Sequence, residues 1–484
     1  MPQMDLNLTV LDLLERSEAR GRGRPAVVSP GGVTNYGQLL DSARILGGAI
    51  ARETACPVVA LFFPMSPEFV EAYFGVLYAG KQALPLNLLL PPEDLIFILK
   101  DSGADSIIAP ADFVPKLQPL GLRVLNFSDL AKAPAAALPP RPKPDDICTL
   151  LYTSGTTGKP KGVMLTHRNL ASNACAAVEA MRLDESVRIM ACLPSFHTFA
   201  ITGTLLAPLT AGGSMTTLPR FDPETVLKTA SELKCDTFLM VPSMYRILTR
   251  LQERRPRDLS HLRLAVSGGE PLNADTRDNF ERVFHLPLLE GYGQTESSPI
   301  VSFNLHGANE PGTVGKPIPG VKLRIVDPET LKDSAGTGEI WVGGPGVMRG
   351  YHNRPEETAK ALHDGWLRTG DMGEIDARGF LRITGRLREM IKVAGEMVFP
   401  AEVENALASH PAVAEVGVAG IQDERKGEIV AAFVTLKENQ QATEEQLFQH
   451  CRAKLAAYKV PKHIFFRSEL PKGPTGKVMR RLLK

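Results

Sequence analysis

The 484-residue sequence contains few cysteines, shows no charge imbalance and lacks long hydrophobic runs. Its six cysteines form no C-x-x-C pair or ligand-like cluster, which argues against a zinc site or a disulfide framework and favours a reducing compartment. The 55 Lys and Arg residues balance 54 Asp and Glu residues, which disfavours broad binding of nucleic acid or of an anionic membrane. No window approaches the roughly 18 consecutive apolar residues of a membrane span. The N-terminus also lacks a signal-peptide pattern, and we expect a cytoplasmic protein.

The distribution of apolar residues predicts an α/β protein with several domain-sized parts. Up to about residue 300, short apolar runs such as 58–63 alternate with helical patterns such as 67–79, which is typical of sheets covered by helices. After Gly312, short strands separated by glycines predict a β-rich subregion. From about Glu389 the pattern becomes a compact α+β segment, whose size fits a small separate domain.

The strongest local signal is TLLYTSGTTGKPKG at residues 149–162, where an apolar strand leads into a loop of Gly, Ser and Thr followed by two lysines. Glycines let backbone N–H groups approach an anion, hydroxyls donate hydrogen bonds, and lysine supplies positive charge. The residue order differs from that of a Walker loop. The pattern therefore predicts a phosphate-binding loop, with a flexible surface loop as the alternative.

This loop resembles the signature of the adenylate-forming superfamily, which includes acyl-CoA synthetases, luciferases and nonribosomal peptide adenylation domains. Further segments resemble the other motifs of that superfamily in the same order, and they are CLPSFHT (192–198), LAVSGGEPL (264–272), LEGYGQTE (289–296), WLRTGD (366–371) and LPKGPTGK (470–477). The resemblance covers nearly the entire chain. It implies an N-terminal adenylation domain over residues 1–387 and a small, mobile C-terminal lid domain over residues 388–484.

The resemblance implies a set of nucleotide-binding residues from several of these segments. They are Thr153, Ser154, Gly155, Thr156, Thr157, Lys161, Gly268, Gly269, Glu270, Glu290, Gly291, Tyr292, Gly293, Asp371, Ile383 and Arg386. Within this set, Tyr292 would stack on the adenine ring. Asp371 would accept hydrogen bonds from the two ribose hydroxyls, since both carboxylate oxygens are acceptors. A helix-capping or Asx-turn role is the alternative for Asp371.

The implied catalytic residues are Lys477, Glu296, Thr295 and His197. Lys477 would lie between the carboxylate and the α-phosphate, and Thr295 would contact a phosphate. Glu296 would hold Mg²⁺, a cation that prefers oxygen ligands. His197 would flank the acyl channel, although a histidine beside two phenylalanines is also typical of core packing. A solvated tail lysine and a turn glutamate are the corresponding alternatives for Lys477 and Glu296.

The resemblance also implies two half-reactions that use ATP, Mg²⁺ and CoA. A carboxylate attacks the α-phosphate of ATP to give an acyl-adenylate and pyrophosphate, and a thiol then displaces AMP. In this superfamily the small C-terminal domain rotates between the two steps. Two departures from the family pattern concern the second step: Arg388 occupies the hinge position, where Asp or Lys is usual, and Ala394 replaces the first glycine of the thiol tunnel.

The segments EGYGQTESSPIVSFN and GEMVFP are most similar to medium- and long-chain fatty acyl ligases and acyl–acyl-carrier-protein synthetases. The expected acyl wall is apolar and consists of Phe196, His197, Ala200, Ile201, Thr202, Gly203 and Val241. An amino acid substrate is disfavoured, since a buried ammonium without a partner is costly. We expect a fatty acid–CoA ligase that is a monomer or a homodimer. The alternatives are transfer to the phosphopantetheine of an acyl carrier protein and a nucleotide-binding regulator without turnover.

Overall fold

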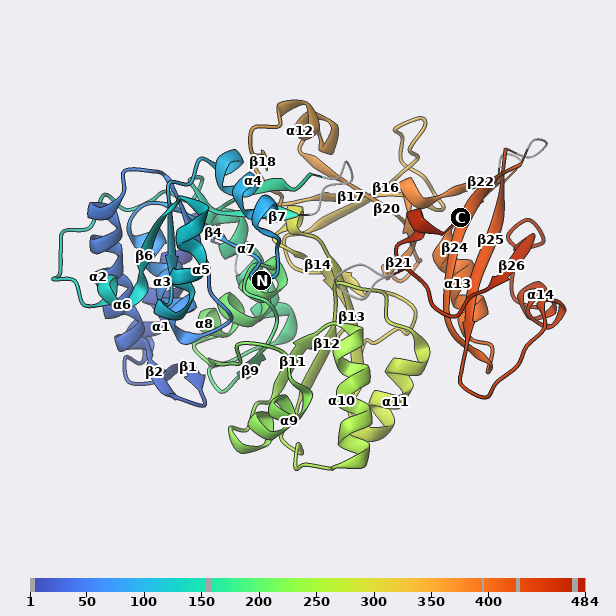
Figure 1. The fold of residues 1–484 in the computed structure, drawn as a ribbon, viewed down its shortest axis with the longest axis horizontal. Coiled ribbons are helices and arrows are strands. Elements are labelled where there is room, and N and C mark those ends of the chain that lie inside the picture. Colours follow the sequence, from blue (N-terminus) through green and yellow to red (C-terminus); the bar gives the residue numbers. More distant parts are fainter. Residues whose placement is uncertain (1–4, 154–158, 394–395, 424–426, 472–477, 484) are drawn as a thin grey trace. The chain divides into compact units, whose positions relative to one another are not determined.

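The computed structural model describes residues 5–153, 159–393, 396–423, 427–471 and 478–483. The chain forms two compact units. Unit 1 comprises Met1–Leu323 and Val342–Arg368, and unit 2 comprises Arg324–Trp341 and Thr369–Lys484 (Figure 1). The expected boundary after residue 387 concerns the segment that moves as a lid, and it stays a prediction.

The larger sheet of unit 1 has nine strands in the order β15-β14-β13-β12-β11-β9-β10-β1-β2. The strands are β15 (Lys316–Pro317), β14 (Ile300–Phe303), β13 (Leu288–Gly293), β12 (Leu264–Ser267), β11 (Thr237–Met240), β9 (Arg188–Ala191), β10 (Ser214–Thr217), β1 (Pro25–Ser29) and β2 (Gly32–Asn35). The strands from β13 to β1 are parallel, and antiparallel strands flank them. Every residue of β11 and β12 is buried, as expected for parallel strands covered on both faces.

The second sheet of unit 1 has seven strands in the order β18-β8-β7-β4-β3-β5-β6. The strands are β18 (Gly350–Tyr351), β8 (Lys161–Thr166), β7 (Ile147–Thr153), β4 (Gln82–Pro85), β3 (Val58–Leu61), β5 (Ser106–Ala109) and β6 (Arg123–Asn126). Its central strands are parallel, whereas β8 and β18 are antiparallel additions at one edge. The predicted strand at 58–63 is confirmed as β3, and the alternation of strands and helices is confirmed.

The helices of unit 1 cover these sheets. They are α1 (Val10–Arg20), α2 (Tyr36–Glu53), α3 (Pro67–Tyr78), α4 (Pro92–Ser102), α5 (Val114–Leu117), α6 (Phe127–Ala131), α7 (His167–Met181), α8 (Ala207–Ala211), α9 (Pro223–Glu232), α10 (Pro242–Arg254), α11 (Ala274–Phe284) and α12 (Pro355–Ala361). Helix α3 begins where the Ser66 hydroxyl accepts from the Phe69 N–H, with Pro67 in the first turn. Helix α7 begins with a capping box between Thr166 and Asn169. These local signals explain why the helical patterns start where they do.

Unit 2 contains most of one five-stranded sheet and all of another. The first has β16 (Lys322–Val326), β17 (Gly338–Gly343), β20 (Trp366–Ile375), β19 (Leu362–His363) and β21 (Leu381–Arg386); the second has β23 (Glu396–Val398), β22 (Ile391–Val393), β25 (Gly427–Leu436), β24 (Val413–Asp423) and β26 (His463–Phe466). Helices α13 (Pro400–Ala408) and α14 (Glu444–Arg452) belong to the same unit. Val403 of α13 and Leu447 of α14 join Val434 of β25 in one hydrophobic core. The predicted β-rich subregion and α+β segment are confirmed.

Candidate functional site

The phosphate loop connects two paired strands of unit 1. Strands β7 and β8 are antiparallel, with Thr153 opposite Lys161. The predicted loop residues Ser154, Gly155, Thr156 and Thr157 lie outside the described residues. Thr153 and Lys161 therefore mark the two ends of the loop, and both belong to paired strands of the seven-stranded sheet.

A carboxylate and an aromatic ring hold the Lys161 side chain. Its ammonium pairs with the Glu357 carboxylate and lies 5.5 Å from the centroid of the Tyr351 ring. The Tyr351 hydroxyl donates a hydrogen bond of 2.9 Å to Glu296 Oε1. Burial, together with the nearby Glu296 carboxylate, raises the pKa of Tyr351 above its usual value, so the hydroxyl keeps the proton that it donates. These contacts join the end of the phosphate loop to the predicted metal ligand.

Strand β18 positions Tyr351 at the loop. Tyr351 lies opposite Val163 in the antiparallel pair of β18 and β8. The His352 N–H donates to the Gly162 carbonyl oxygen at 2.7 Å, which extends this pairing toward the loop. The pairing of two segments that are far apart in sequence thus fixes the contact between Tyr351 and Lys161.

Thr295 and Glu296 lie in the 3-10 turn η4 (Thr295–Ser297), directly after β13. The Thr198 hydroxyl donates to Thr295 Oγ1 at 2.9 Å, and the Met348 N–H donates to the Glu296 carbonyl oxygen at 2.8 Å. Two segments that are distant in sequence therefore hold the turn that carries Thr295 and Glu296.

The donor set fits a Mg²⁺ ion that is bound together with a polyphosphate. Among the described residues, no group of three or more His, Cys, Asp and Glu side chains could hold a metal ion. Glu296 offers one carboxylate, and Mg²⁺ is usually bound through one or two carboxylates together with substrate phosphates. A single glutamate beside a phosphate loop is therefore sufficient protein ligation.

Glycines bring the backbone of β12 and β13 close to a shared space. Gly268 and Gly269 follow β12, and Gly269 has a φ of +82°, which favours glycine. Tyr292 lies between Gly291 and Gly293 in β13, and a Cβ on Gly293 would lie 1.9 Å from the Pro299 carbonyl oxygen. A side chain is therefore excluded at Gly293, as expected where a backbone must approach closely.

Polar groups near these glycines are buried. Glu290 accepts a hydrogen bond of 3.0 Å from the Leu272 N–H, yet burial raises the pKa of Glu290 to about 7. Ser267 Oγ and Gln294 Nε2 are buried and have no hydrogen-bond partner among the described residues. Glu270 is partly exposed. Unpaired buried polar atoms are costly, so a bound molecule that supplied partners would stabilise this region.

A small apolar cavity of about 80 Å³ lies among the same strands. Besides the four glycines, Tyr292, Pro299 and Ser302, its lining side chains are Met181, Phe199, Leu239, Val266, Ile300 and Phe303. The Ser302 hydroxyl donates to the Val314 carbonyl oxygen at 2.9 Å. None of these lining side chains is charged, so the cavity suits an alkyl or aryl group and offers no partner for an ammonium.

The predicted acyl wall differs from the observed lining. His197 is exposed, although the surrounding protein partly desolvates its ring and lowers its pKa below the usual value. Ala200 and Gly203 are buried within the π-helical segment η3 (Ala200–Leu206) and do not line the cavity, whereas the preceding residue Phe199 does. Because a π-helix shifts its hydrogen bonds by one residue, local helix periodicity does not predict which side chains of such a segment face a ligand.

The predicted ribose residues of unit 2 share one strand pair. Asp371 of β20 lies opposite Arg386 of β21, with Arg386 Nε 3.0 Å from Asp371 Oδ1. The Asp371 side chain is 5% exposed, whereas that of Arg386 is 47% exposed. Ile383 is partly buried, two positions before Gly385 on β21. Strand register therefore brings Asp371 and Arg386 together, whereas Ile383 lies opposite Gly373.

Lys477 and Ala394 lie outside the described residues. Arg388 is exposed in the 3-10 turn η5 (Leu387–Glu389). Shortly after Lys477 in sequence, the Arg480 guanidinium forms a bidentate pair with Glu404 of α13, with N–O distances of 2.8 and 2.6 Å. This pair attaches the chain after the predicted lysine to the core of unit 2.

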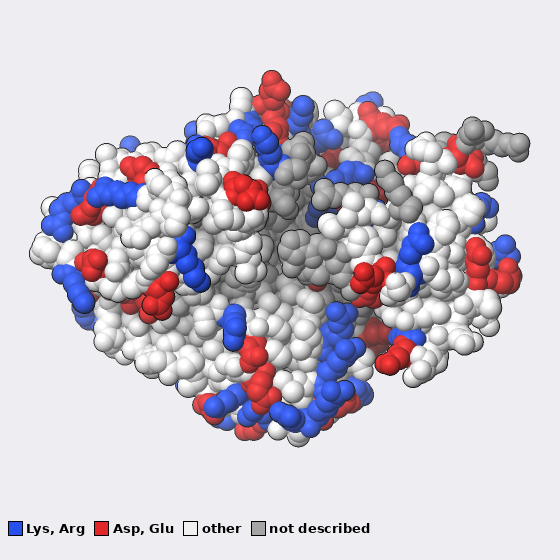
Figure 2. Space-filling model, viewed as in Figure 1, with Lys and Arg blue, Asp and Glu red and all other residues white. Residues whose placement is uncertain are grey.

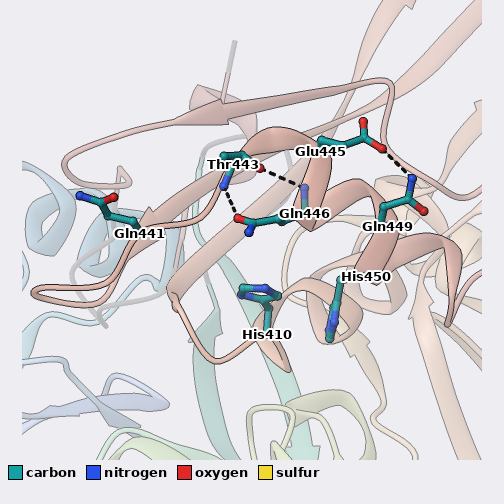
Figure 3. Close-up of a pocket in the computed structure, with 7 residues that line it drawn as sticks. All are labelled: His410, Gln441, Thr443, Glu445, Gln446, Gln449 and His450. Carbon is teal, nitrogen blue, oxygen red and sulfur yellow. Dashed lines mark hydrogen bonds between the residues drawn. The ribbon is translucent and has the colours of Figure 1, made fainter.

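A second, more open hollow of about 460 Å³ lies in unit 2 (Figure 3). It is lined by His410, Gln441, Thr443, Glu445, Gln446, Gln449 and His450. Its polar groups bond with one another, as when the Gln446 N–H donates to Thr443 Oγ1 and the Gln449 amide donates to Glu445. None of these residues belongs to the motifs above, and the hollow adds nothing to the candidate site.

Basic side chains gather over α10 and α11 of unit 1 (Figure 2). Many of them have acidic partners: Arg257 pairs with Glu224, and Arg282 pairs with Glu253 at 2.8 Å. This surface is therefore only partly compensated, since Arg246, Arg250 and Arg254 of α10 form no ion pair among the described residues.

The sequence pattern did not indicate Tyr351, Glu357 or Thr198. Tyr351 and Glu357 lie in one segment, GYHNRPEET at 350–358, whose Asn and Pro signal a turn and a helix start. The turn and the start of α12 could therefore be predicted from these Asn and Pro residues. The contacts of this segment with Lys161 and Glu296 depend on strand pairing across the chain, which no local pattern indicates.

Comparisons with known proteins agree with this arrangement. Residues 14–352 match the AMP-binding enzyme family, and residues 402–477 match the AMP-binding enzyme C-terminal domain. The chain is 35% identical over 527 residues to a long-chain-fatty-acid–CoA ligase of Bacillus subtilis (strain 168), covering 99% of this chain and 94% of the relative. It is also 35% identical over 429 residues to a feruloyl-CoA synthase of an Amycolatopsis species, covering 87% of each chain.

Solved structures show the same fold. The anthranilate CoA ligase AuaEII in complex with anthranoyl-AMP has a TM-score of 0.89 at 32% identity, covering 99% of this chain and 97% of that one. ATP-bound MatB from Rhodopseudomonas palustris has a TM-score of 0.90 at 30% identity, covering 98% of each chain. Fold and sequence together define an adenylate-forming enzyme of the acid–thiol ligase class. The chain belongs to the AMP-binding enzyme family.

No helix in the described part of the chain combines the length and the apolar character needed to cross a membrane.

Proposed function

We propose that this enzyme activates a fatty acid with ATP and Mg²⁺, releases pyrophosphate, and transfers the acyl group from the acyl-adenylate to the thiol of CoA. The contacts from Lys161 through Tyr351 to Glu296 carry the proposal, because they join a phosphate loop to a metal-binding carboxylate. The likeness to a long-chain-fatty-acid–CoA ligase supports the class of acid and the acceptor.

In this proposal the nucleotide contacts three groups of residues. Lys161 and the loop from Thr153 bind the β- and γ-phosphates, Tyr292 and the neighbouring glycines contact the adenine, and Asp371 accepts from the ribose hydroxyls. Lys161 is paired with Glu357 in this structure, so phosphate binding exchanges one anionic partner of the lysine for another. Arg386 holds the Asp371 carboxylate in the same way before the ribose binds.

Glu296 would hold Mg²⁺ together with phosphate oxygens, and the ion would supply neutralisation of phosphate charge. The Tyr351 hydrogen bond orients the Glu296 carboxylate for this purpose. The Thr198 hydroxyl likewise orients Thr295, whose own hydroxyl then donates to a phosphate oxygen.

The first step forms a bond between an oxygen of the acid and the α-phosphorus, while the bond to pyrophosphate breaks. Positioning and charge stabilisation supply most of the catalysis in such a displacement. We assign Lys477 to the charge that develops between carboxylate and α-phosphate, and we place His197 beside the acyl chain. In the second step the CoA sulfur attacks the acyl carbon and AMP leaves with the bonding electrons; residues 388–484 act as the lid that exchanges Lys477 for the thiol channel.

The apolar cavity supports a substrate with an alkyl or aryl body. Its lining side chains carry no charge, and Phe199 and Phe303 are aromatic. An amino acid would leave its ammonium without a partner there. Because named relatives act on long-chain fatty acids and on ferulate, the choice between these two classes of acid needs a direct test.

The test measures pyrophosphate release with ATP, Mg²⁺ and a panel of fatty acids, aromatic acids and amino acids. We expect the highest kcat/KM with a fatty acid and no release with amino acids. Absence of release with every acid would contradict the proposal and support a nucleotide-binding regulator. Adding CoA or an acyl carrier protein to the preformed adenylate then separates the two acceptors, and we expect transfer to CoA. A cytoplasmic location and a monomeric or homodimeric state stay predictions.

A further inference from the structure

The cavity is too small for the acid that the proposed function assigns to it. Its volume is about 80 Å³, roughly half of the 150 Å³ of an engineered protein cavity that takes up benzene. A long acyl chain therefore requires one wall of the cavity to move. The further inference concerns which wall moves, and it rests on the proposed function.

Most of the wall is fixed by packing. Leu239, Val266 and Phe303 are at most 5% exposed and belong to hydrophobic clusters. The Phe199 ring occupies space that glycines leave free: a Cβ on Gly203 would lie 3.2 Å from it, and a Cβ on Gly268 would lie 3.4 Å from it. Shifting any of these groups would disturb a close-packed core.

Strand β14 is fixed as well. The Ile300 N–H donates to Asn173 Oδ1 at 3.1 Å, and Asn173 Nδ2 donates to the Ile300 carbonyl oxygen at 2.8 Å. Asn173 is buried in α7, so this helix and β14 are held together at that point. Ile300 is also β-branched and has few accessible rotamers.

Met181 differs from the rest of the wall in three respects. It is the last residue of α7, and the following Arg182 has a left-handed φ of 52°. It lines the cavity and packs, as a partly buried residue, against two hydrophobic clusters, those of Leu239 and of Phe303. Its side chain is unbranched with three rotatable bonds, so it adapts to other shapes at little cost. Met181 is therefore the lining side chain that can change its shape at the least cost.

The position of Met181 places it at the end of the cavity away from the nucleotide motifs. Asn173, eight residues earlier on α7, donates to the carbonyl oxygens of Ser297 and Ile300, beside the turn that carries Thr295 and Glu296. At 1.5 Å per residue, Met181 lies about 12 Å further along the helix, away from that turn.

The outer side of Met181 is apolar. Met181 packs with the partly buried Ala180, Leu305 and Val321 against the cluster of Ala176, Phe303 and Ile318. An alkyl chain that displaced the Met181 side chain would therefore meet the apolar side chains of Ala180, Leu305 and Val321. The chain would extend past α7 without losing all of its contact with the protein.

We propose that Met181 is a plug at the distal end of the acyl cavity, and that its displacement lets chains longer than the cavity pass out at the C-terminal end of α7, beyond the contact between Asn173 and Ile300. The residue determines which chain lengths are accepted: short acids leave the plug in place, and long acids displace it. The ligand class is an unbranched fatty acid with its carboxylate at the nucleotide end.

The test compares kcat/KM for palmitate and hexanoate in wild type, Met181→Trp and Met181→Ala. Met181→Trp replaces the flexible plug with a rigid ring, so the palmitate/hexanoate ratio should fall at least about tenfold. Met181→Ala removes the plug, so the ratio should rise several-fold. The same substitutions at Met244, a partly buried methionine of α10 outside the cavity, should leave the ratio at its wild-type value.

If the palmitate/hexanoate ratio is unchanged in both Met181 variants, the proposal that Met181 acts as a plug is wrong. The proposed function would remain intact, because each enzyme still activates its acids. A fall in the ratio with Met181→Ala would also overturn the plug, since a smaller side chain cannot block the exit. Failure of the wild type to activate any fatty acid would instead count against the proposed function. If Met181→Trp does not fold, the direction in which Met181→Ala changes the palmitate/hexanoate ratio is sufficient to test the proposal.

Discussion

The predicted site residues of unit 1 and of unit 2 are held in different ways. In unit 1, Lys161, Tyr351 and Glu296 come from three segments and are connected by tertiary contacts. In unit 2, Asp371 and Arg386 face each other across adjacent strands, and the arginine is half exposed. The comparison shows that packing between distant segments positions Lys161, Tyr351 and Glu296, whereas local strand register suffices for the pair of Asp371 and Arg386, which we propose contacts the ribose. Substitutions within the group of Lys161, Tyr351 and Glu296 should therefore reduce activity more than substitution of Arg386 does.

The largest effect is expected for Lys477→Ala, the proposed catalytic lysine. Loss of a charge that acts mainly in the transition state should cost on the order of 3–4 kcal/mol, which is about 10²–10³-fold in pyrophosphate release. Transfer from supplied acyl-AMP to CoA should persist. Both half-reactions are measured separately, with the exposed Lys437→Ala as the matched control. Equal loss of both half-reactions would contradict a role confined to adenylation.

Glu290→Gln should change how stability depends on pH. Burial raises the pKa of Glu290 from 4.5 to about 7, so the folded state keeps a proton that the unfolded state loses between these values. Wild-type stability therefore falls as pH rises from about 4.5 to 7. The variant should gain on the order of 3 kcal/mol relative to wild type between pH 4 and pH 8.

Denaturant unfolding of both proteins at pH 4, 6 and 8 checks this expectation. The exposed Glu93→Gln serves as the control and should show no such trend. A difference between Glu290→Gln and wild type that stays constant with pH would show that Glu290 is not a buried titrating group.

Tyr351→Phe removes the hydrogen bond to Glu296 and keeps the ring above Lys161. Hydrogen bonds to charged groups contribute about 1.5–3 kcal/mol, so kcat/KM for ATP should fall about tenfold or more. The Mg²⁺ concentration for half-maximal activity should rise as well. Tyr36→Phe removes a buried hydroxyl that donates to Gly213 at 2.7 Å in another part of unit 1, and it should leave the Mg²⁺ dependence unchanged. An unaltered Mg²⁺ dependence in Tyr351→Phe would argue against the orienting role.

The smallest effect is expected for Arg386→Ala in unit 2. Its pair with Asp371 is half exposed on the arginine side, so the free energy of unfolding should fall by up to about 1 kcal/mol. The KM for ATP should rise a few-fold. Arg382→Ala, on the same strand and 3.7 Å from Glu374, is the control for stability. A loss in Arg386→Ala as large as that in Tyr351→Phe would remove the distinction between the two arrangements.

Much of the fold follows from the sequence, because hydrophobic period and capping are local properties. The apolar run at 58–63 and the Ser66 cap with Pro67 are sufficient to predict β3 and α3. The change of pattern after Gly312 likewise predicts the β-rich part of unit 2. These elements depend on residues that are neighbours in sequence.

The candidate site is predictable only in part. Glu296 and Asp371 stand in motifs whose order along the chain is specific. Tyr351 and Glu357, however, reach Lys161 through the pairing of β18 with β8, which no local pattern encodes. The predicted acyl wall stays a prediction; in the structure Ala200 and Gly203 are buried in the π-helical segment η3, whereas Phe199 lines the cavity.

The most direct test of the central claim is detection of the acyl-adenylate itself. The enzyme is incubated with ATP, Mg²⁺ and a fatty acid in the absence of CoA, and the bound products are analysed by mass spectrometry. The account predicts enzyme-bound acyl-AMP with pyrophosphate in equal amount, and its conversion to acyl-CoA and AMP when CoA is added. Absence of an acyl-adenylate with every carboxylic acid supplied would contradict it.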